Sequence, residues 1–268
     1  MSAVQRVVMV VAIAVAAVLV IAAIAPTLLW PLDPLATDPG GAFAPPSAAH
    51  PFGTDQSGRD VLARVLAGTR LSLGVGLAAT TAALVVGLAI GTASGFAGRG
   101  VDSVLTRAIE VITAFPEFLL ALVIVAIIGP GPIGVAVAIS IAAVPAYARV
   151  ARAGTLSARR AGHVTAARVL GVGAVRTAWR HVVPAVMGPL LAMATIGVGM
   201  AIVTAAGLAF LGLGAQPPTP EWGLILDDGR NHLGRAWWIA LFPGIAITVT
   251  VLATSVIGRA VRRRVEAA

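Results

Sequence analysis

Residues 7–29 read VVMVVAIAVAAVLVIAAIAPTLL, a run without a single charged side chain. An α-helix needs about 20 predominantly apolar residues to cross the ~30 Å hydrocarbon core of a bilayer, so this run is long enough to span. Outside this run the chain has the same character, since 58% of all its residues are hydrophobic and only 11% are charged. Soluble domains carry about 25% charged residues. We therefore expect an all-α integral membrane protein.

Five further apolar runs complete a set of six predicted membrane spans. A tight turn, Gly129-Pro130-Gly131-Pro132, separates the third run from the fourth, so these two are expected to form a helical hairpin. Pro116 is expected to kink the third run. The first run is longer than the apolar region of a signal peptide, and we expect it to remain as an uncleaved helix. The five further runs are 71–95, 111–128, 133–148, 186–206 and 239–257.

The arginines orient these spans. With six spans and a cytoplasmic N-terminus, the outer loops hold only Arg59, Arg64, Arg70, Arg230 and Arg235, which leaves fourteen of the nineteen basic residues inside. This asymmetry follows the positive-inside rule, so both termini are predicted to be cytoplasmic. The same rule accounts for the net charge of +8 without a nucleic-acid partner.

Composition also excludes several kinds of site. The chain has no cysteine and no lysine. A P-loop needs its Gly-Lys-Ser/Thr to hold nucleotide phosphates, so this chain cannot be its own ATPase of that kind. The four histidines lie far apart in the predicted topology, which makes a built metal site improbable. We expect no catalytic residue, no metal site and no cofactor in this chain.

Between the fourth and fifth spans, a cytoplasmic loop at about residues 150–184 contains the stretch GHVTAARVLG and, nine residues later, HVVP. Ala166 and Ala167 keep one face of a short helix thin, so a neighbouring chain can approach closely. Gly171 can adopt the positive φ that ends such a helix. Pro184 can begin the next element, where its missing N–H does little harm. We expect two short helices joined at residues 171–173.

This spacing resembles the Glu-Ala-Ala loop of ATP-binding-cassette (ABC) importer permeases, with Thr165 where that motif has its acid. Longer strings are similar to the second, C-type permease subunit of dipeptide, oligopeptide and nickel importers. They are FGTDQSGRDVL at 52–62, FLGLGAQPPTPEWG at 210–223 and ALFPG at 240–244.

The resemblance implies a permease subunit in a bacterial plasma membrane that forms half of a pathway for peptides. A second, similar permease would supply the other half, two ATPase subunits would use ATP and Mg²⁺, and an extracytoplasmic solute-binding protein would deliver the cargo. It further implies that the cytoplasmic loop docks into a groove on an ATPase. Clustered arginines lying on anionic lipid are an alternative for this loop. The residues of the expected coupling loop are His163, Thr165, Ala166, Ala167, Arg168, Gly171 and Pro184.

Other readings remain open at this point. The cargo could be a nickel chelate, haem or another small solute. A passive channel would show a filter sequence and an intramembrane enzyme would show converging catalytic groups, and the sequence contains neither. The domain division expected is an N-terminal helix with its outer loop at 1–70 and a permease domain at 71–268.

Several further residues are singled out by their position. Glu117 lies within a span and has no basic neighbour, which makes it a candidate for the transport pathway. Glu110 is three residues from Arg107, so an interfacial ion pair is expected. In the last outer loop, the candidate contacts with the delivery protein are Glu221, Asp227, Asp228 and Arg230.

The remaining expectations concern packing. A short interfacial helix is expected over 57–68, and Trp237 and Trp238 are expected in an aromatic belt at the membrane surface. Small residues recur four apart at Gly74 and Ala78 and at Gly87, Gly91 and Gly95, a pattern that suits close helix–helix contact.

Overall fold

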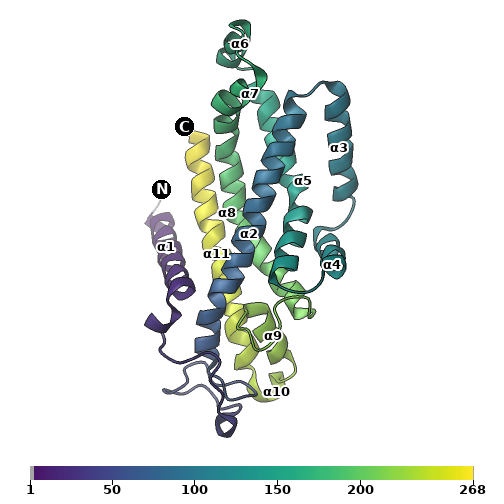
Figure 1. Cartoon of the computed structure of the whole chain (residues 1–268). Coiled ribbons are helices and arrows are strands. Elements are labelled where there is room, and N and C mark those ends of the chain that lie inside the picture. The colour runs from purple at the N-terminus through teal and green to yellow at the C-terminus, as the bar shows by residue number, and fades with distance from the viewer. Residues whose placement is uncertain (1–2, 268) are drawn as a thin grey trace.

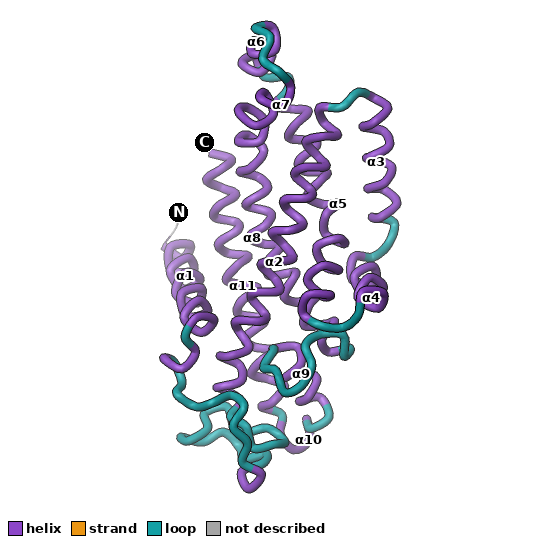
Figure 2. Tube along the Cα trace, in the orientation of Figure 1, coloured by secondary structure: helices purple, strands orange, loops and turns teal. Residues whose placement is uncertain are grey.

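The computed structural model describes residues 3–267, apart from the side chains of His163, Arg168 and residues 264–267. Every regular element in that part of the chain is helical (Figures 1 and 2). The longer elements are α1 (Ala3–Ile24), α2 (Val61–Phe96), α3 (Arg99–Thr113), α4 (Glu117–Ile128), α5 (Pro132–Ala158), α8 (Val183–Phe210) and α11 (Trp238–Ala267). The shorter ones are η1 (Pro26–Leu28), η2 (Pro39–Gly41), α6 (Gly162–Val169), α7 (Ala174–Thr177), η3 (Ala178–Val182), α9 (Trp222–Arg230) and α10 (Leu233–Ala236).

The long helices α2, α5, α8 and α11 lie side by side as a bundle, with α1 against α2 and α11 (Figure 1). The loop between α1 and α2 gathers at one end together with α9 and α10. At the opposite end α6 and α7 project beyond the bundle, and the N-terminus of α1 and the C-terminus of α11 point the same way. The fold therefore has one end built from loops and one end built from a small helical projection.

Five helices are long and apolar enough to cross a membrane, and six spans result if α3 and α4 are counted as one. The expected bend at Pro116 is confirmed, but it is a 90° break between two helices rather than a kink within the run 111–128, and α3 begins at Arg99. The break falls at residues 114–116. Pro116 cannot donate a helical hydrogen bond, and its ring disfavours helical geometry at Phe115.

The short helix expected over 57–68 was also wrong, since these residues include the first turns of α2. The carboxylate of Asp60 accepts a hydrogen bond from the Ala63 amide at 2.7 Å and caps the helix. From Val61 the helix then continues without interruption to Phe96. The turn between the third and fourth apolar runs is confirmed, with positive φ at Gly129 and Gly131 before α5 begins at Pro132.

Glycines let α2 and α5 pack closely. A Cβ atom added to Gly87 would lie 2.5 Å from Cβ of Tyr147, and one added to Gly91 would lie 2.5 Å from Cβ of Ala151. The expectation of close contact is confirmed at Gly87, Gly91 and Gly95. At Gly74 an added Cβ would meet no described atom of this chain within 4 Å, so the expected contact is not formed between its own helices.

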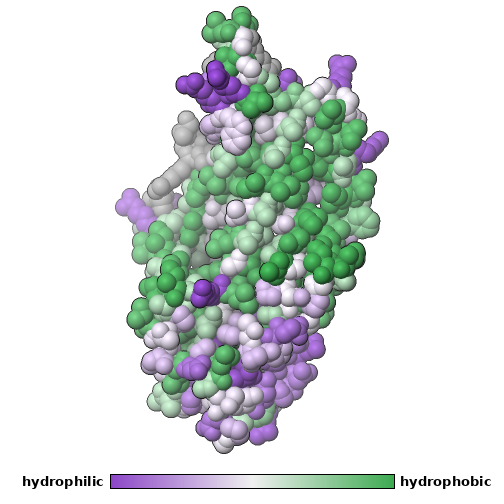
Figure 3. Space-filling model, viewed as in Figure 1, coloured by the Kyte–Doolittle hydropathy of each residue, from purple (hydrophilic) through white to green (hydrophobic). Residues whose placement is uncertain are grey.

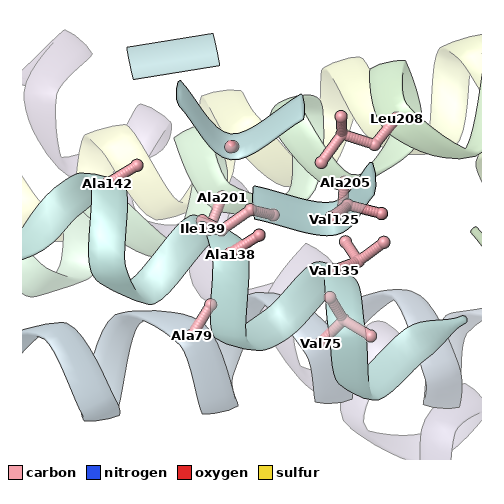
Figure 4. Close-up of a cluster of buried hydrophobic side chains, with 11 residues drawn as sticks. Val75, Ala79, Val125, Val135, Ala138, Ile139, Ala142, Ala201, Ala205 and Leu208 are labelled. Carbon is pink, nitrogen blue, oxygen red and sulfur yellow. The ribbon is translucent and has the colours of Figure 1, made fainter. Parts of the chain in front are cut away.

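The largest buried cluster lies where α4 and α5 meet α2 and α8 (Figure 4). Small side chains dominate it, so the helices approach closely rather than through long interdigitating side chains. Outside this core, apolar side chains cover the middle of the molecule and hydrophilic ones collect at the end with α9 and α10 (Figure 3). The labelled core residues are Val75, Ala79, Val125, Val135, Ala138, Ile139, Ala142, Ala201, Ala205 and Leu208.

Candidate functional site

The helical projection formed by α6 and α7 is the first candidate site. Gly171 has φ of +78°, and the Val172 amide donates to the carbonyl of Ala167 at 3.0 Å. This is a Schellman ending, in which a left-handed residue closes the helix and satisfies a terminal carbonyl. Gly171 ends α6 as expected, but the second expected short helix is not separate, because α7 is the beginning of the continuous helical segment 174–210.

Pro184 lies in the first turn of α8, as expected, but α8 is not separated from the preceding helix. The segment 174–210 is helical throughout, and the π-helical turn η3 ends at Val182, directly before α8 begins. Because proline lacks an amide hydrogen, a helix that runs through it loses one regular hydrogen bond, and the wider turn accommodates that loss. The projection is consequently joined to the bundle by an unbroken helix.

The surface of this projection is unusually apolar for a part of the chain that extends beyond the bundle. Val169 and Leu170 at the end of α6 are each 82% exposed, Val175 is 74% exposed and Trp179 is 68% exposed. Thr165 and Ala166 are also exposed. The side chains of His163 and Arg168 lie outside the described residues. An exposed apolar cluster of this kind is typical of a surface that a partner covers.

Two acidic residues of the third apolar run have different surroundings. Glu110 forms the expected ion pair with Arg107, at 3.3 Å between Nη1 and Oε2 on an exposed surface. Glu117 is the first residue of α4, directly after the 90° break. It lines a cavity of about 240 Å³ between α2, α5 and α8. Its role in transport stays a prediction.

At the other end of the bundle, Glu221 caps α9 by accepting hydrogen bonds from the amides of Gly223 at 3.0 Å and Leu224 at 2.9 Å. The Ser72 hydroxyl of α2 donates to the same carboxylate at 3.1 Å. Glu221 is only 6% exposed, and burial raises its pKa above the ordinary value. The carboxylate therefore stabilises the fold here, and the expectation that it is an outward-facing contact does not fit this burial.

The other three residues of that predicted contact lie on α9. Asp227 and Arg230 pair at 2.9 Å, and Arg230 is exposed. Asp228 is turned inward, 3.5 Å from the guanidinium of Arg64 on α2, and burial raises the pKa of its carboxyl. A contact of Asp227 and Arg230 with a delivery protein stays a prediction.

Sequence reasoning missed the buried charge cluster that joins the loop before α2 to α2 and α9. Asp55 is 2% exposed and accepts two guanidinium hydrogen bonds, from Nε of Arg59 and from Nη1 of Arg64, each at 2.7 Å. Arg64 is 1% exposed and also faces Asp228. The string at 52–62 was singled out by resemblance and by the spacing of Arg59, Asp60 and Arg64 for i,i+4 pairs, and only the folded loop shows that Asp55 is the carboxylate both arginines meet.

Trp238 belongs to the same end of the molecule. It was expected in an aromatic belt, but it is 5% exposed and its Nε1–H donates to the carbonyl of Thr54 at 3.0 Å. Nearby, the rings of Phe52 and Phe242 stack with centroids 3.8 Å apart. Only Trp237 of the pair is half exposed. The belt expectation was wrong for Trp238 because the outer loop folds back over it.

A second polar link was also missed, at the end of the bundle nearer α6. Arg152 of α5 donates two hydrogen bonds to the Asp102 carboxylate of α3, both at 2.6 Å. The Ser94 hydroxyl of α2 donates to the same carboxylate. An acid in the first turn of α3 and an arginine near the end of α5 carried no local spacing signal, since the two residues are 50 positions apart.

Comparison with known proteins identifies the family to which a chain of this architecture belongs. Residues 83–267, which run from the second half of α2 to α11, match the family described as binding-protein-dependent transport system inner membrane component. The chain belongs to this family. It is therefore a multi-pass protein of the bacterial inner membrane, and the match includes the segments that carry the projection, Glu117 and α9.

Curated relatives of this inner membrane component cover most of its length. The dipeptide transport system permease protein DppC of Escherichia coli K12 is 46% identical over 86% of this chain and 75% of the relative. The di/tripeptide permease DppC of Pseudomonas aeruginosa is 39% identical over 87% and 78%. The glutathione transport system permease GsiD of Pectobacterium atrosepticum is 38% identical over 81% and 72%.

Among solved structures, the crystal structure of an amino acid ABC transporter with histidines matches with a TM-score of 0.59. The match covers 75% of the inner membrane component and 94% of the other chain, at 19% identity. At that identity the likeness concerns the fold alone. It supports the arrangement of the bundle.

Proposed function

We propose that this inner membrane component is one of two permease subunits of an ABC importer that carries peptides. The observation that supports a peptide cargo best is the 38–46% identity to permeases of dipeptide, di/tripeptide and glutathione transport systems, over more than four fifths of this chain. In this proposal the chain forms half of the pathway and catalyses no reaction itself.

The proposal assigns ATP hydrolysis to two separate ATPase subunits, which would bind ATP and Mg²⁺. The absence of lysine supports that division, because a P-loop lysine cannot be present. A solute-binding protein would deliver the peptide at the end of the bundle that carries α9 and α10. The family's description as binding-protein-dependent supports this partner.

The projection formed by α6 and α7 would be the docking point for an ATPase. The helical segment 174–210 has 37 residues, or about 55 Å at 1.5 Å per residue, so it extends well beyond a ~30 Å hydrocarbon core. A movement imposed on α6 would pass along this unbroken helix into the membrane. The exposed side chains of Val169, Leu170 and Val175 supply an apolar contact, and exposed Arg176 and Arg180 supply positive charge.

The proposed docking of α6 and α7 on a cytoplasmic ATPase also implies an orientation of the chain in the membrane. If α6 faces the cytoplasm, both ends of the chain are cytoplasmic, because α1 and α11 direct them toward the same end of the bundle (Figure 1). Arginine-rich segments then lie inside, as the positive-inside rule requires. The division into residues 1–70 and 71–268 stays a proposal, with α2 continuous across residue 70.

The test is reconstitution of the complete complex in proteoliposomes with a peptide-loaded binding protein. We expect ATP-dependent uptake of radiolabelled dialanine, and we expect Gly171→Pro to abolish it while the chain still inserts. Proline cannot adopt φ of +78°, so the elbow would change direction. Uptake of a nickel chelate or haem but no peptide would replace the cargo assignment, and ion conduction by the chain alone would indicate a passive channel. Normal uptake by Gly171→Pro would refute the docking assignment.

A further inference from the structure

The cavity beside Glu117 lies about halfway along the helices α2, α5 and α8. Its walls come from Thr80 in the central part of α2, Tyr147 on α5 and Met193 and Met200 on α8, with Glu117 at the start of α4. The volume of about 240 Å³ is below the roughly 300–1,000 Å³ of drug-sized ligand sites. It can therefore hold one end of a small molecule rather than the whole of it.

The charge in this cavity is unbalanced. Glu117 is its acidic group, and none of the lining residues carries a positive charge. A carboxylate at membrane depth is costly unless it has a partner or water. The first turn of α4 stabilises the negative charge, because the free amides of a helix N-terminus are partially positive. Glu117 is exposed in the single chain, so its carboxylate is open to a cation that this chain does not provide.

Two hydroxyl groups complete the polar part of the cavity. Tyr147 is 3% exposed and Thr80 is 5% exposed, and both line the cavity. Neither hydroxyl forms a hydrogen bond to another described residue, and both atoms remain accessible from the cavity rather than fully enclosed. Together with the carboxylate they form the polar part of an otherwise apolar cavity, an arrangement that suits a polar ligand. An ammonium group, with three donors, matches one carboxylate and two hydroxyl acceptors.

The rest of the wall is apolar and adaptable. The remaining lining residues are apolar and include Ile139, Met193 and Met200 together with small residues of α2, α5 and α8. Methionine side chains are flexible and polarisable, so they can pack against differently shaped groups. This combination fits a family of molecules that share one cationic end and differ elsewhere.

We propose that Glu117, Thr80 and Tyr147 form a site for the α-ammonium group of the transported peptide, halfway along its path. The site rests on the proposed function, since peptides share a free amino end and vary in their side chains. Glu117 would neutralise the ammonium charge in the membrane interior, where water cannot, and the methionines would face the variable first side chain. The binding is transient, as passage requires a site that the cargo can leave.

The test uses the complete complex in proteoliposomes with dialanine and a saturating concentration of loaded binding protein. Glu117→Gln should slow dialanine uptake about tenfold or more, because a hydrogen bond to a charged group contributes roughly a tenfold factor. Glu117→Asp should retain most of the rate. The matched control is Glu110→Gln, an exposed carboxylate of the same run paired with Arg107, which should leave uptake unchanged.

Two further readouts separate a ligand site from a structural role. Stimulation of ATP hydrolysis by the loaded binding protein should persist in Glu117→Gln, since docking and coupling are untouched. A water-soluble carbodiimide, which joins a carboxyl to an amine without a spacer, should attach dialanine to Glu117 and should fail to do so in the variant.

If the Glu117→Gln complex takes up dialanine at the wild-type rate, the ammonium site is refuted and the proposed function still stands. Parallel loss of uptake and ATPase stimulation would overturn it too, as would a carbodiimide link from Glu117 to an amine of the second permease. Absence of dialanine uptake by the wild-type complex would instead refute the proposed function.

Discussion

Replacing Asp55 by asparagine tests how much the buried charge cluster contributes to the fold. Asparagine has the same shape and keeps Oδ1 as acceptor for the amides of Ser57 at 2.8 Å and Arg59 at 3.0 Å. Its NH₂ group, however, replaces the Oδ2 atom that Arg59 and Arg64 both contact at 2.7 Å. Two guanidinium donors would then face a third donor in a site that water does not reach.

The magnitude follows from burial. Arg64 and Asp55 are 1% and 2% exposed, and removing one partner of such a buried pair costs about 3–5 kcal/mol. Arg64 keeps Asp228 at 3.5 Å, which places the loss at the lower end, about 3 kcal/mol. For a chain of this size about 1 kcal/mol shifts the melting temperature by roughly 2–4 °C, so Asp55→Asn should lower it by about 6–12 °C.

The assay is thermal unfolding of the purified complex in detergent, combined with limited proteolysis of the loop at 31–60. The control is Arg107→Ala, which breaks a pair whose side chains are 82% and 57% exposed and should cost at most about 1 kcal/mol. We expect faster cleavage of the loop in Asp55→Asn alone. Equal melting temperatures for the two variants would refute the reasoning that this cluster holds the loop to α2 and α9.

Three other substitutions test the packing. Gly91→Val should cost about 2 kcal/mol or more in thermal unfolding, because its side chain would collide with Ala148 and Ala151, whereas Gly74→Val, with open space around it, should change stability by less than about 0.5 kcal/mol. Trp222→Phe removes the hydrogen bond from Nε1 to the Val65 carbonyl, 2.8 Å long in a fully buried site, and should lower the free energy of unfolding by about 1–3 kcal/mol. The control Trp179→Phe changes an exposed side chain and should leave the free energy of unfolding unchanged. Asp102→Asn weakens the link between α3 and α5, so amide hydrogen exchange should accelerate in α3 and not in α8, and unchanged exchange in α3 would contradict this role.

Much of the membrane architecture could be predicted because the length of each hydrophobic run and the positions of the arginines can be read directly from short stretches of sequence. The hairpin turn at Gly129 to Pro132 and the end of α6 at Gly171 are fixed by the conformational range of single residues, so they were also predictable. Composition could not predict the 90° angle at residues 114–116. Pro116 interrupts the helix, but the direction that α4 takes after it depends on the packing of Ala121 and Val125 against α5.

The site was predictable only where its chemistry is local. The coupling elbow has its own spacing, and Glu117 stands out as a charge within an apolar run. By contrast, the partners of Asp102 and Trp238, which are Arg152 and Thr54, lie 50 and 184 positions away in sequence. Asp55 meets arginines only four and nine positions away, but they lie where an irregular loop joins α2, and spacing alone does not show which charges pair there. Glu221 could be read as a surface acid because the sequence does not reveal that Ser72 and the first turn of α9 surround it.

The central claim is that α6 reaches into the cytoplasm and contacts an ATPase. The chain contains no cysteine, so Ala166→Cys would introduce a single thiol at an exposed position of α6. A photoactivatable thiol reagent such as benzophenone maleimide, attached at this position, needs no thiol on its partner and should join α6 to an ATPase subunit when the assembled complex is illuminated. A membrane-impermeant thiol reagent added outside intact cells should not label this position. Labelling from outside, or a complex that transports peptide yet yields no cross-link to an ATPase, would contradict the account.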